Sequence, residues 1–347
     1  MSRIGVLGAG TWGMALARML SNVGNAVTVW SALKQEVEDY ARERKHPNLP
    51  GMVIPEAIIF TADIKEAVSA MDLVIFAVPS VFVRSTAHTA APYLPDGQLI
   101  VDVAKGIEPE TLDTMSEIIA DELKKDGSHD HIRVVALSGP THAEEVAKDL
   151  PTTIVSASPD EEAAKAVQDI FMNTCMRVYT NTDIRGVELC GAMKNIMALA
   201  AGISIGLGFG DNTKAAIITR GMAEMTRLGL AMGCQAETFF GLAGIGDLIV
   251  TATSLHSRNN RCGMLIGQGV SPDEAVKQIG MVVEGINALP AAMLLKEKYG
   301  VEMPIAEAVN AVIKEGVDPK DAVISLMTRD KKSEGIRESI AEVLKKK

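Results

Sequence analysis

The chain has 347 residues, long enough for two domains with separate hydrophobic cores. Apolar residues make up 47% of it and aromatic residues only 4%, so the predicted cores are aliphatic. The formal net charge is -10 and no basic stripe stands out, which argues against a nucleic-acid-binding protein. An anionic substrate would therefore need a local cationic pocket. No uninterrupted apolar run is long enough to predict a membrane span convincingly.

A glycine-rich motif lies near the start of the chain. Gly8, Gly10 and Gly13 follow a predicted strand, 4–7, and precede an apolar pattern with helical spacing. In a G-x-G-x-x-G motif the first glycine permits a tight turn, the second lets a pyrophosphate approach the backbone, and the third lets helix and strand pack closely. A second predicted strand, 26–30, completes a β-α-β unit. The alternative is a glycine-rich turn without a cofactor, but this context favours a dinucleotide site at the helix N-terminus.

The rest of the first half alternates strand-like and helix-like segments. The further predicted strands are 58–61, 73–78, 99–103, 134–137, 152–157 and 176–180. Strands separated by helices predict a Rossmann-like α/β domain with a doubly wound, mostly parallel sheet, which we assign to residues 1–183.

The second half has a different pattern. Long apolar-periodic stretches at 184–207, 213–232 and 290–299 predict helices, and Pro290 suits the first turn of the last one. Only 248–251 resembles a strand, and we interpret the glycines at 241–246 as a turn. Residues 184–347 are therefore predicted to form an all-α substrate and catalytic domain, with the closing lysines 345–347 as a solvated tail. Four scattered cysteines without a C-x-x-C pair are typical of a reduced cytoplasmic protein.

In a doubly wound sheet, ligands bind at the carboxyl ends of the strands. That rule draws attention to Pro79, Lys105 and the segment 139–143. Thr141 and Glu144 also fit a capping box, so the residues alone leave the role of Thr141 open between a helix cap and a ligand contact.

Lys194 is the most informative single residue of the second half. Between Gly186 and Gly206 the only polar side chains are Glu188, Lys194, Asn195 and Ser204. A helix that is apolar on nearly every face is buried, and a buried lysine needs a partner or a task. The alternative is a lysine whose ammonium extends into water.

Two polar features further along could serve Lys194 or a substrate. Asp247 directly precedes the apolar run 248–250 and could hold an ammonium group or cap a turn. The segment 257–261 is rich in hydrogen-bond donors and lacks an acid, so it could clamp a phosphate, because a guanidinium offers paired N–H groups. A solvated polar loop is the alternative for this segment.

Over nearly its whole length the chain resembles the bacterial type of NAD(P)-dependent glycerol-3-phosphate dehydrogenases. Several blocks occur in the right order, which is far more specific than one glycine motif. The blocks are Gly8–Gly13, Lys105–Gly106, Ser138–Ala143, Glu188–Asn195, Gly244–Thr251, Ser257–Asn259 and Val282–Gly285.

The resemblance implies that Lys194 is the catalytic proton donor and acceptor, placed and charged with the help of Asp247. Together with the glycine motif it predicts cofactor contacts from Gly8, Gly10, Thr11, Trp12, Gly13, Ser31, Lys105, Ala143, Arg258, Val282 and Glu284. The implied substrate contacts are Lys105, Gly139, Thr141, Lys194, Asp247, Ser257, Arg258 and Asn259. The chain departs from the family pattern at 30–33, where many members carry an Arg or His.

The resemblance implies reversible, NAD(P)H-dependent reduction of dihydroxyacetone phosphate to sn-glycerol 3-phosphate, which supplies glycerophospholipid synthesis. No acid directly follows the second strand, and Glu36 is the nearest one downstream. We therefore expect both nicotinamide cofactors to work, with a modest lean towards NADPH, and no metal. The expected partner is a small molecule, with no nucleic acid and no membrane span; a homodimer is left open. The alternatives are a 3-hydroxyacid dehydrogenase of similar architecture and a nicotinamide-sensing protein that does not turn over.

Overall fold

The computed structural model describes residues 1–125, 127–331 and 334, so the predicted tail at 345–347 lies outside the described residues. The chain divides into two compact units. We call Met1–Lys105 with Asp113–Ile184 the sheet unit, and Gly106–Leu112 with Arg185–Lys347 the helical unit. Residues 106–112 join the helical unit because Ile107 and Leu112 pack against its hydrophobic core. The predicted domains 1–183 and 184–347 do not assign residues 106–112 to the helical unit.

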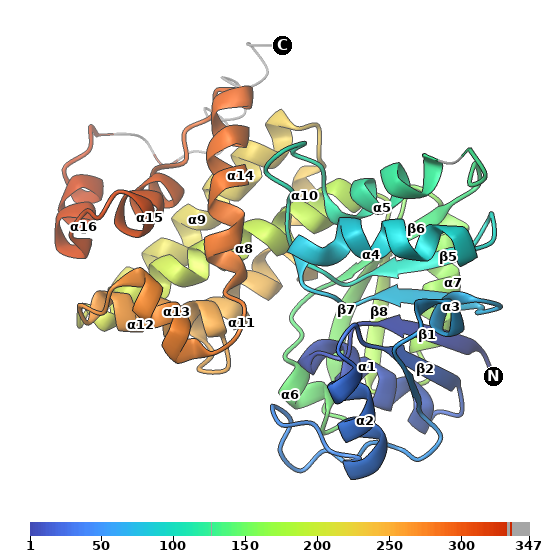
Figure 1. Ribbon diagram of the computed structural model, residues 1–347. Coiled ribbons are helices and arrows are strands. Elements are labelled where there is room, and N and C mark those ends of the chain that lie inside the picture. Colours follow the sequence, from blue (N-terminus) through green and yellow to red (C-terminus); the bar gives the residue numbers. More distant parts are fainter. Residues whose placement is uncertain (126, 332–333, 335–347) are drawn as a thin grey trace. The chain divides into compact units, whose positions relative to one another are not determined.

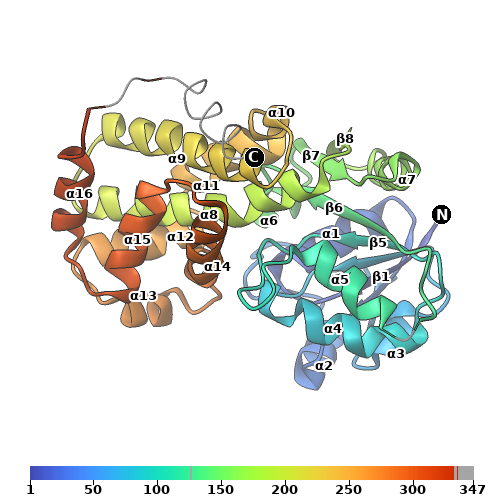
Figure 2. The ribbon, with the colours of Figure 1, turned by 90° about the horizontal axis from the view of Figure 1, so that it is seen from above.

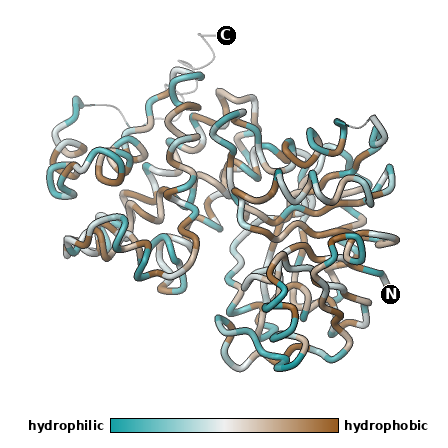
Figure 3. The backbone as a smooth tube through the Cα atoms, viewed as in Figure 1, coloured by the Kyte–Doolittle hydropathy of each residue, from teal (hydrophilic) through white to brown (hydrophobic). Residues whose placement is uncertain are grey.

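The sheet unit is built on one eight-stranded sheet with the order β3-β2-β1-β4-β5-β6-β7-β8. Every pairing is parallel except β6 with β7. The strands are β1 (Arg3–Leu7), β2 (Ala26–Trp30), β3 (Ile59–Thr61), β4 (Leu73–Phe76), β5 (Leu99–Asp102), β6 (Arg133–Ser138), β7 (Thr152–Ala157) and β8 (Met176–Asn181). The predicted doubly wound, mostly parallel sheet is confirmed. Figure 3 shows apolar residues along the strands themselves, as expected for a sheet covered on both faces.

Helices cover both faces of this sheet (Figure 1). They are α1 (Thr11–Asn22), α2 (Lys34–Glu43), α3 (Ile64–Val68), α4 (Val83–Ala90), α5 (Met115–Lys124), α6 (Ala143–Val146) and α7 (Glu161–Phe171), with short 3-10 turns at Ser80–Phe82 and Ala91–Tyr93. Alternate strand residues belong to different cores. Ile4 and Val6 lie in the core beneath α1, α6 and α7, whereas Leu7 lies in the core beneath α3, α4 and α5. The sheet therefore presents its strand ends between two helical layers.

The helical unit is built around α8 (Ile184–Gly206), which is buried along nearly its whole length. Figure 2 shows α8 running among the other helices of this unit. They are α9 (Asp211–Ala231), α10 (Ala236–Phe239), α11 (Asp247–Thr253), α12 (Arg258–Gly267), α13 (Pro272–Ile279), α14 (Glu284–Tyr299), α15 (Pro304–Lys314) and α16 (Pro319–Met327). By length and composition α8 could cross a membrane, but 83% of its apolar window is buried inside the structure. That burial is the pattern of a core helix.

Three local predictions for the helical unit are wrong. Residues 248–251 belong to α11 rather than to a strand, because an apolar run of four residues fits a buried helix as well as a buried strand. The glycines at 242–246 form a π-helical turn that leads directly into α11. Pro290 lies inside α14 instead of in its first turn, and its position is exposed. The residues before it, from Glu284 on, are already helical.

Glycines allow α8 and α12 to cross with their backbones in contact. A methyl group added at Gly202 or Gly206 would lie 2.1 Å from Asn260 O or 2.2 Å from Met264 O. On the other helix, a methyl group at Gly263 would lie 2.3 Å from Leu199 O, and one at Gly267 would lie 2.3 Å from Ile203 O. Both helices carry their glycines four residues apart, so the same face of each helix is bare. This crossing brings the first turn of α12 close to α8.

Candidate active site

The three glycines of the N-terminal motif have different local environments. Gly8 has φ of +120°, and an added methyl group would lie 2.7 Å from the backbone of Ala77. A methyl group at Gly13 would lie 2.1 Å from Gly8 O. At Gly10 an added methyl group would meet nothing within 4 Å. Gly8 and Gly13 are therefore required by the fold itself, whereas the space beside Gly10 is open, as the approach of a pyrophosphate requires.

The first turn of α1 fits an anionic group. Gly10 is the N-cap residue of α1 and provides no side-chain cap. Thr11 Oγ1 is buried and has no hydrogen-bond partner, and the neighbouring Trp12 packs against the core of the sheet unit. A buried hydroxyl without a partner is costly unless a ligand supplies one. The residues present at this turn therefore fit a dinucleotide.

The carboxyl ends of β5 and β6 bring Lys105, Gly139 and Thr141 together. Lys105 Nζ donates a hydrogen bond to Gly139 O at 3.3 Å, and Thr141 Oγ1 donates to the same oxygen at 3.1 Å. The helix-cap alternative for Thr141 is wrong, since α6 begins at Ala143 with His142 as its N-cap and no side-chain cap. Thr141 lies one residue before this N-cap, so its side chain does not occupy the capping position.

A bidentate ion pair connects the residues after α6, which begins with Ala143, to α1. Arg18 Nη1 and Nη2 donate to Asp149 Oδ1 and Oδ2, each at 2.9 Å. Asp149 follows α6 and has φ of +56°. The planar fork of the guanidinium fixes orientation as well as distance. The segment with the predicted substrate and cofactor residues is thereby held beside the glycine turn.

Lys194 lies in the middle of α8 and forms a buried ion pair with Asp247 at the start of α11. Their side chains are 7% and 1% exposed, and Lys194 Nζ lies 2.5 Å from Asp247 Oδ1. The sequence prediction of a buried lysine that needs a partner is confirmed, and the alternative of an ammonium in water is wrong. Since a buried charge requires compensation, this pair fixes the position of the ammonium group.

Thr251 is a member of this site that the sequence analysis missed. Lys194 Nζ donates to Thr251 Oγ1 at 2.6 Å, and Thr251 Oγ1 donates its own proton to Asp247 O at 2.7 Å. Because that proton is directed away, the hydroxyl oxygen presents a lone pair to the ammonium. Residues four apart lie on one face of a helix, so a helical interpretation of 248–251 would have placed Thr251 beside Asp247. The strand interpretation concealed it.

The donor-rich segment 257–261 is not a solvated loop. Ser257 is the N-cap of α12 and accepts a hydrogen bond from Asn260 N at 3.2 Å. Ser257, Asn259 and Asn260 are buried, whereas Arg258 is half-buried. Three of the segment's five residues are therefore buried at the start of α12, and the half-buried Arg258 lies between two of them.

Asn259 connects three helices through its side-chain amide. Asn259 Nδ2 donates to Asn195 Oδ1 at 2.9 Å, and Gly285 N donates to Asn259 Oδ1 at 2.8 Å. Asn195 follows Lys194 on α8, and its own Nδ2 donates to Gly191 O at 3.1 Å. Asn195 is one of the few polar residues of an apolar helix, but the sequence alone does not indicate this role for it.

The last two predicted cofactor residues flank the start of α14. Val282 and Glu284 stand on either side of Val283, the N-cap residue of α14, and both are half-buried. Gly285, whose N–H is bonded to Asn259, follows directly. The predicted contacts on α12 and α14 are thus joined by one hydrogen bond.

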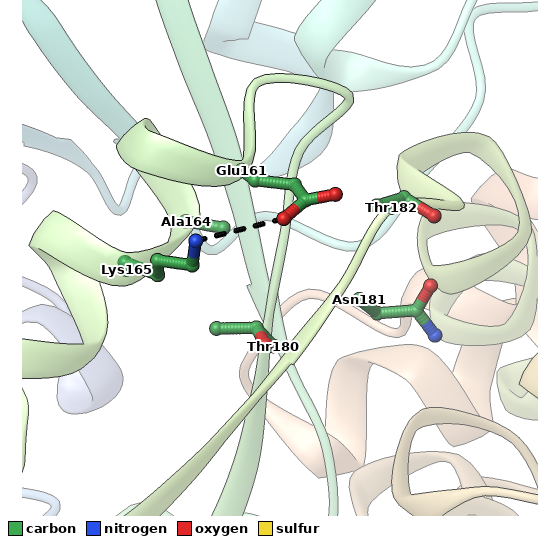
Figure 4. Close-up of a pocket in the computed structure, with 6 residues that line it drawn as sticks. All are labelled: Glu161, Ala164, Lys165, Thr180, Asn181 and Thr182. Carbon is green, nitrogen blue, oxygen red and sulfur yellow. Dashed lines mark ion pairs between the residues drawn. The ribbon is translucent and has the colours of Figure 1, made fainter.

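A separate hollow in the sheet unit contains none of the predicted site residues. It has a volume of about 320 Å³ and is lined by Glu161, Ala164, Lys165, Thr180, Asn181 and Thr182. Figure 4 shows Lys165 directed to Glu161 on its own helix, at 3.6 Å. Within the described part of the chain, no three His, Cys, Asp or Glu side chains gather to hold a metal ion.

A glycine turn at the head of a doubly wound sheet and a lysine buried in an all-α unit define the class of two-part nicotinamide-dependent dehydrogenases. The chain belongs to the NAD-dependent glycerol-3-phosphate dehydrogenases, since residues 3–164 match the model of that family's N-terminus and residues 183–324 match the model of its C-terminus. The predicted family and the predicted oxidoreductase class are confirmed.

Named relatives and a solved structure agree with this assignment. The chain is 66% identical over 334 residues to glycerol-3-phosphate dehydrogenase [NAD(P)+] 2 of Lactobacillus delbrueckii subsp. bulgaricus, covering 96% of this chain and 99% of the relative. It is 52% identical to glycerol-3-phosphate dehydrogenase [NAD(P)+] of Agathobacter rectalis, covering 96% and 98%. The crystal structure of glycerol-3-phosphate dehydrogenase from Coxiella burnetii has a TM-score of 0.89 at 36% identity, covering 94% and 99%. These similarities set aside the 3-hydroxyacid dehydrogenase and the sensing protein.

Proposed function

We propose that this protein catalyses the reversible NAD(P)H-dependent reduction of dihydroxyacetone phosphate to sn-glycerol 3-phosphate in the cytoplasm and so supplies glycerophospholipid synthesis. The observation that carries the proposal is the Lys194–Asp247 pair, buried in the helical unit of a chain of this family. The four cysteines, all in the described part of the chain, form no disulfide, which supports a reducing compartment. We assign residues 1–183 to cofactor binding and 184–347 to substrate binding and catalysis.

In this proposal the cofactor lies along the glycine turn. Gly10 leaves space for the pyrophosphate, and Thr11 Oγ1 and the N-terminus of α1 supply hydrogen-bond donors. When bound, the nicotinamide supplies a hydride to C2 of the substrate. The further cofactor contacts are Gly8, Trp12, Gly13, Ser31, Lys105, Ala143, Arg258, Val282 and Glu284. Both NADH and NADPH are used, with a modest lean towards NADPH, because Ser31 rather than an acid directly follows β2.

The substrate is held by its phosphate and by its ketone oxygen. Arg258 offers a guanidinium fork to the phosphate, with Ser257 and Asn259 beside it in the first turn of α12. Lys105, Gly139 and Thr141 form the contacts from the sheet unit. Because the chain carries a net charge of -10, these local donors must offset repulsion of a doubly charged phosphate.

Lys194 acts as the general acid in reduction and as the general base in oxidation. Its ammonium donates a proton to the oxygen at C2 while negative charge develops there. Asp247 and Thr251 each accept a hydrogen bond from Nζ, so the ammonium is held in one position before the substrate binds. Preorganised charge needs no rearrangement during the reaction, which is why a buried pair suits this task.

The first experiment follows the loss of reduced cofactor with three ketones. Dihydroxyacetone phosphate should be reduced, whereas unphosphorylated dihydroxyacetone and a 3-keto acid should react at least about a hundredfold more slowly in kcat/KM. Equal rates with and without the phosphate would contradict the proposed role of Arg258. Turnover of the 3-keto acid alone would contradict the proposed substrate.

The second experiment removes the proton donor. Lys194→Ala should lower kcat by roughly 10² to 10⁴, the usual effect of losing a general acid, with little change in the Kd for NADPH. The single change leaves Asp247 buried without its cation and can unfold the protein. The double variant Lys194→Met with Asp247→Asn removes both charges, so it should fold and be equally inactive. Wild-type kcat in either folded variant would contradict the proposal.

A further inference from the structure

The end of β2 carries a carboxylate that is brought back from the following helix. Ser31 directly follows β2 and is 6% exposed. Ser31 Oγ donates a hydrogen bond to Glu36 Oε2 at 2.7 Å and accepts one from Leu33 N at 3.2 Å. Glu36 lies in the first turn of α2, so the chain folds back on itself within five residues. The sequence expectation that no acid stands at this strand end holds for the residue that follows β2, but not for the space around it.

This strand end adjoins the glycine turn. Gly8 N donates to Trp30 O at 3.0 Å, so the residue before Ser31 is bonded to the first glycine of the motif. In dinucleotide-binding folds the group at the end of the second strand meets the ribose of the adenosine half. An acid there accepts a hydrogen bond from the 2′-hydroxyl of NADH and repels the 2′-phosphate of NADPH. In this chain Ser31 occupies that position, and the carboxylate of Glu36 accepts a hydrogen bond from its hydroxyl group.

We propose that Glu36, acting through the hydroxyl of Ser31, sets the balance between NADH and NADPH. The inference rests on the proposed cofactor site and deepens it. The Ser31 proton is directed to Glu36, so the hydroxyl oxygen accepts a hydrogen bond from a ribose 2′-hydroxyl and has no proton to donate to a 2′-phosphate. Glu36 is therefore a positioning residue that keeps the lean towards NADPH modest.

The charges around this site agree with the inference. Of the ten residues of α2, four are acidic and two are basic. Glu36 also acts on His46, since its charge favours the imidazolium, but burial dominates and lowers the pKa of His46 below 6.5. A neutral imidazole does not offset the carboxylate at neutral pH. Burial, together with the charges of Glu36 and Asp39, raises the pKa of Tyr40 to about 12, so the phenol stays neutral as well.

Two arginines in and after α2 bond to neighbouring groups, whereas the lysine at its start is exposed. Arg42 pairs with Asp39 and Glu43. Arg44 Nη1 donates to Pro55 O at 3.2 Å and to Ile58 O at 2.9 Å. Lys34, the first residue of α2, is exposed and lies three positions beyond Ser31. Its ammonium is a cation within three residues of this strand end and can offset part of the charge of Glu36.

The test is the ratio of the two cofactor affinities. Kd values for NADH and NADPH are measured by cofactor fluorescence for the wild type, for Glu36→Gln and for Glu38→Gln, which removes one exposed charge from the same helix. Glu36→Gln should raise the preference for NADPH at least about tenfold, because the glutamine amide can donate to Ser31 Oγ and so release the hydroxyl proton for a 2′-phosphate. Glu38→Gln should change the ratio less than about twofold, since an exposed charge is screened. A purely structural loss would weaken both affinities together and leave the ratio unchanged.

A double-mutant cycle tests the route through Ser31. In a Ser31→Ala background Glu36→Gln should shift the ratio by much less than in the wild type, because the intervening hydroxyl is absent. An unchanged ratio in Glu36→Gln, or an equal shift in both backgrounds, would overturn the inference while the cofactor site stands. Failure of the wild type to bind either cofactor would instead contradict the proposed function.

Discussion

At the scale of single residues, the site combines chemistry that the sequence reveals with positioning that only the fold reveals. Lys194 is recognisable in the sequence because it interrupts an apolar helix, and Asp247 because it stands beside an apolar run. Thr251 is not recognisable in that way, since a threonine in an apolar segment is common in helices and strands alike. Its role follows from its contacts, which orient both partners of the ion pair.

We expect Thr251→Val to affect catalysis rather than cofactor binding. Valine has nearly the same shape but cannot accept the hydrogen bond from Lys194 Nζ, and a hydrogen bond to a charged group contributes about 1.5 to 3 kcal/mol. The value of kcat should therefore fall about tenfold or more, and its pH profile should shift, while the Kd for NADPH is unchanged.

Thr251→Ser is the matched control because it retains the hydroxyl, and it should recover most of the lost kcat. A valine variant with the wild-type pH profile would show that Thr251 only fills space. Steady-state kinetics over a range of pH and a cofactor titration distinguish these outcomes.

At the scale of elements, the sheet was more predictable than the helices. All eight strands were predicted, the central ones because strands buried on both faces are continuous apolar runs such as Leu73–Phe76. The run at 248–251 has the same composition, but it forms part of α11, and that error removed Thr251 from view. Pro290 likewise suggested a helix start, although it lies inside α14 at an exposed position.

Tertiary proximity accounts for the remaining omissions at the site. The meeting of Ser31 with Glu36, and of Asn259 with Asn195 and Gly285, depends on how elements pack. No periodicity in one segment encodes such contacts between segments. Residue type and spacing therefore predicted the site's principal groups, whereas the fold was needed to find the groups that orient them.

The glycine turn separates structural from ligand-dependent positions, which gives a prediction. Gly10→Val should fold normally, because its added Cβ meets open space, but it should weaken NADPH binding about a hundredfold or more by occupying the place of the pyrophosphate. Thermal unfolding and a cofactor titration check the two halves of this statement.

Gly13→Ala provides the contrast within the same turn. Its Cβ would lie 2.1 Å from Gly8 O, so the helix must shift and the protein should lose about 1 to 3 kcal/mol of stability. Normal affinity in Gly10→Val, or a Gly10→Val variant less stable than Gly13→Ala, would contradict the division of roles.

At the scale of the whole molecule, we expect the free energy of unfolding to depend on pH through Glu224, a buried carboxyl group of the helical unit. Glu224 on α9 is 2% exposed and accepts hydrogen bonds from Ile305 N at 2.7 Å and Ala306 N at 3.2 Å. It thus caps the N-terminus of α15 from another helix. Burial raises its pKa to about 7, against the opposing effects of these two N–H groups and Arg227; Glu307 adds to the rise.

The sign of the pH effect follows from that pKa. Between pH 4.5 and about 7 the folded protein keeps a proton on Glu224 that the unfolded chain releases, so this group's contribution to stability falls as pH rises through that window. The full difference corresponds to about 3 kcal/mol. Glu224→Gln cannot ionise, so the stability of the wild type relative to this variant should decrease between pH 4.5 and 7.

Urea unfolding at several pH values measures this difference. Glu237→Gln, which removes an exposed carboxylate from the same unit, should show no comparable trend. A constant difference between the wild type and Glu224→Gln over the whole range would contradict the prediction.

The glycine-lined crossing of α8 and α12 also limits which substitutions this protein can accept. Every single-nucleotide change that replaces a glycine introduces a side chain or a stop. At Gly202, Gly206, Gly263 and Gly267 even the smallest side chain would lie within 2.3 Å of a backbone oxygen. None of the four positions can therefore change without displacing the helix that begins with Arg258 and Asn259. A substitution at any of these glycines is therefore expected to lower substrate turnover, although none of the four is among the proposed ligand contacts.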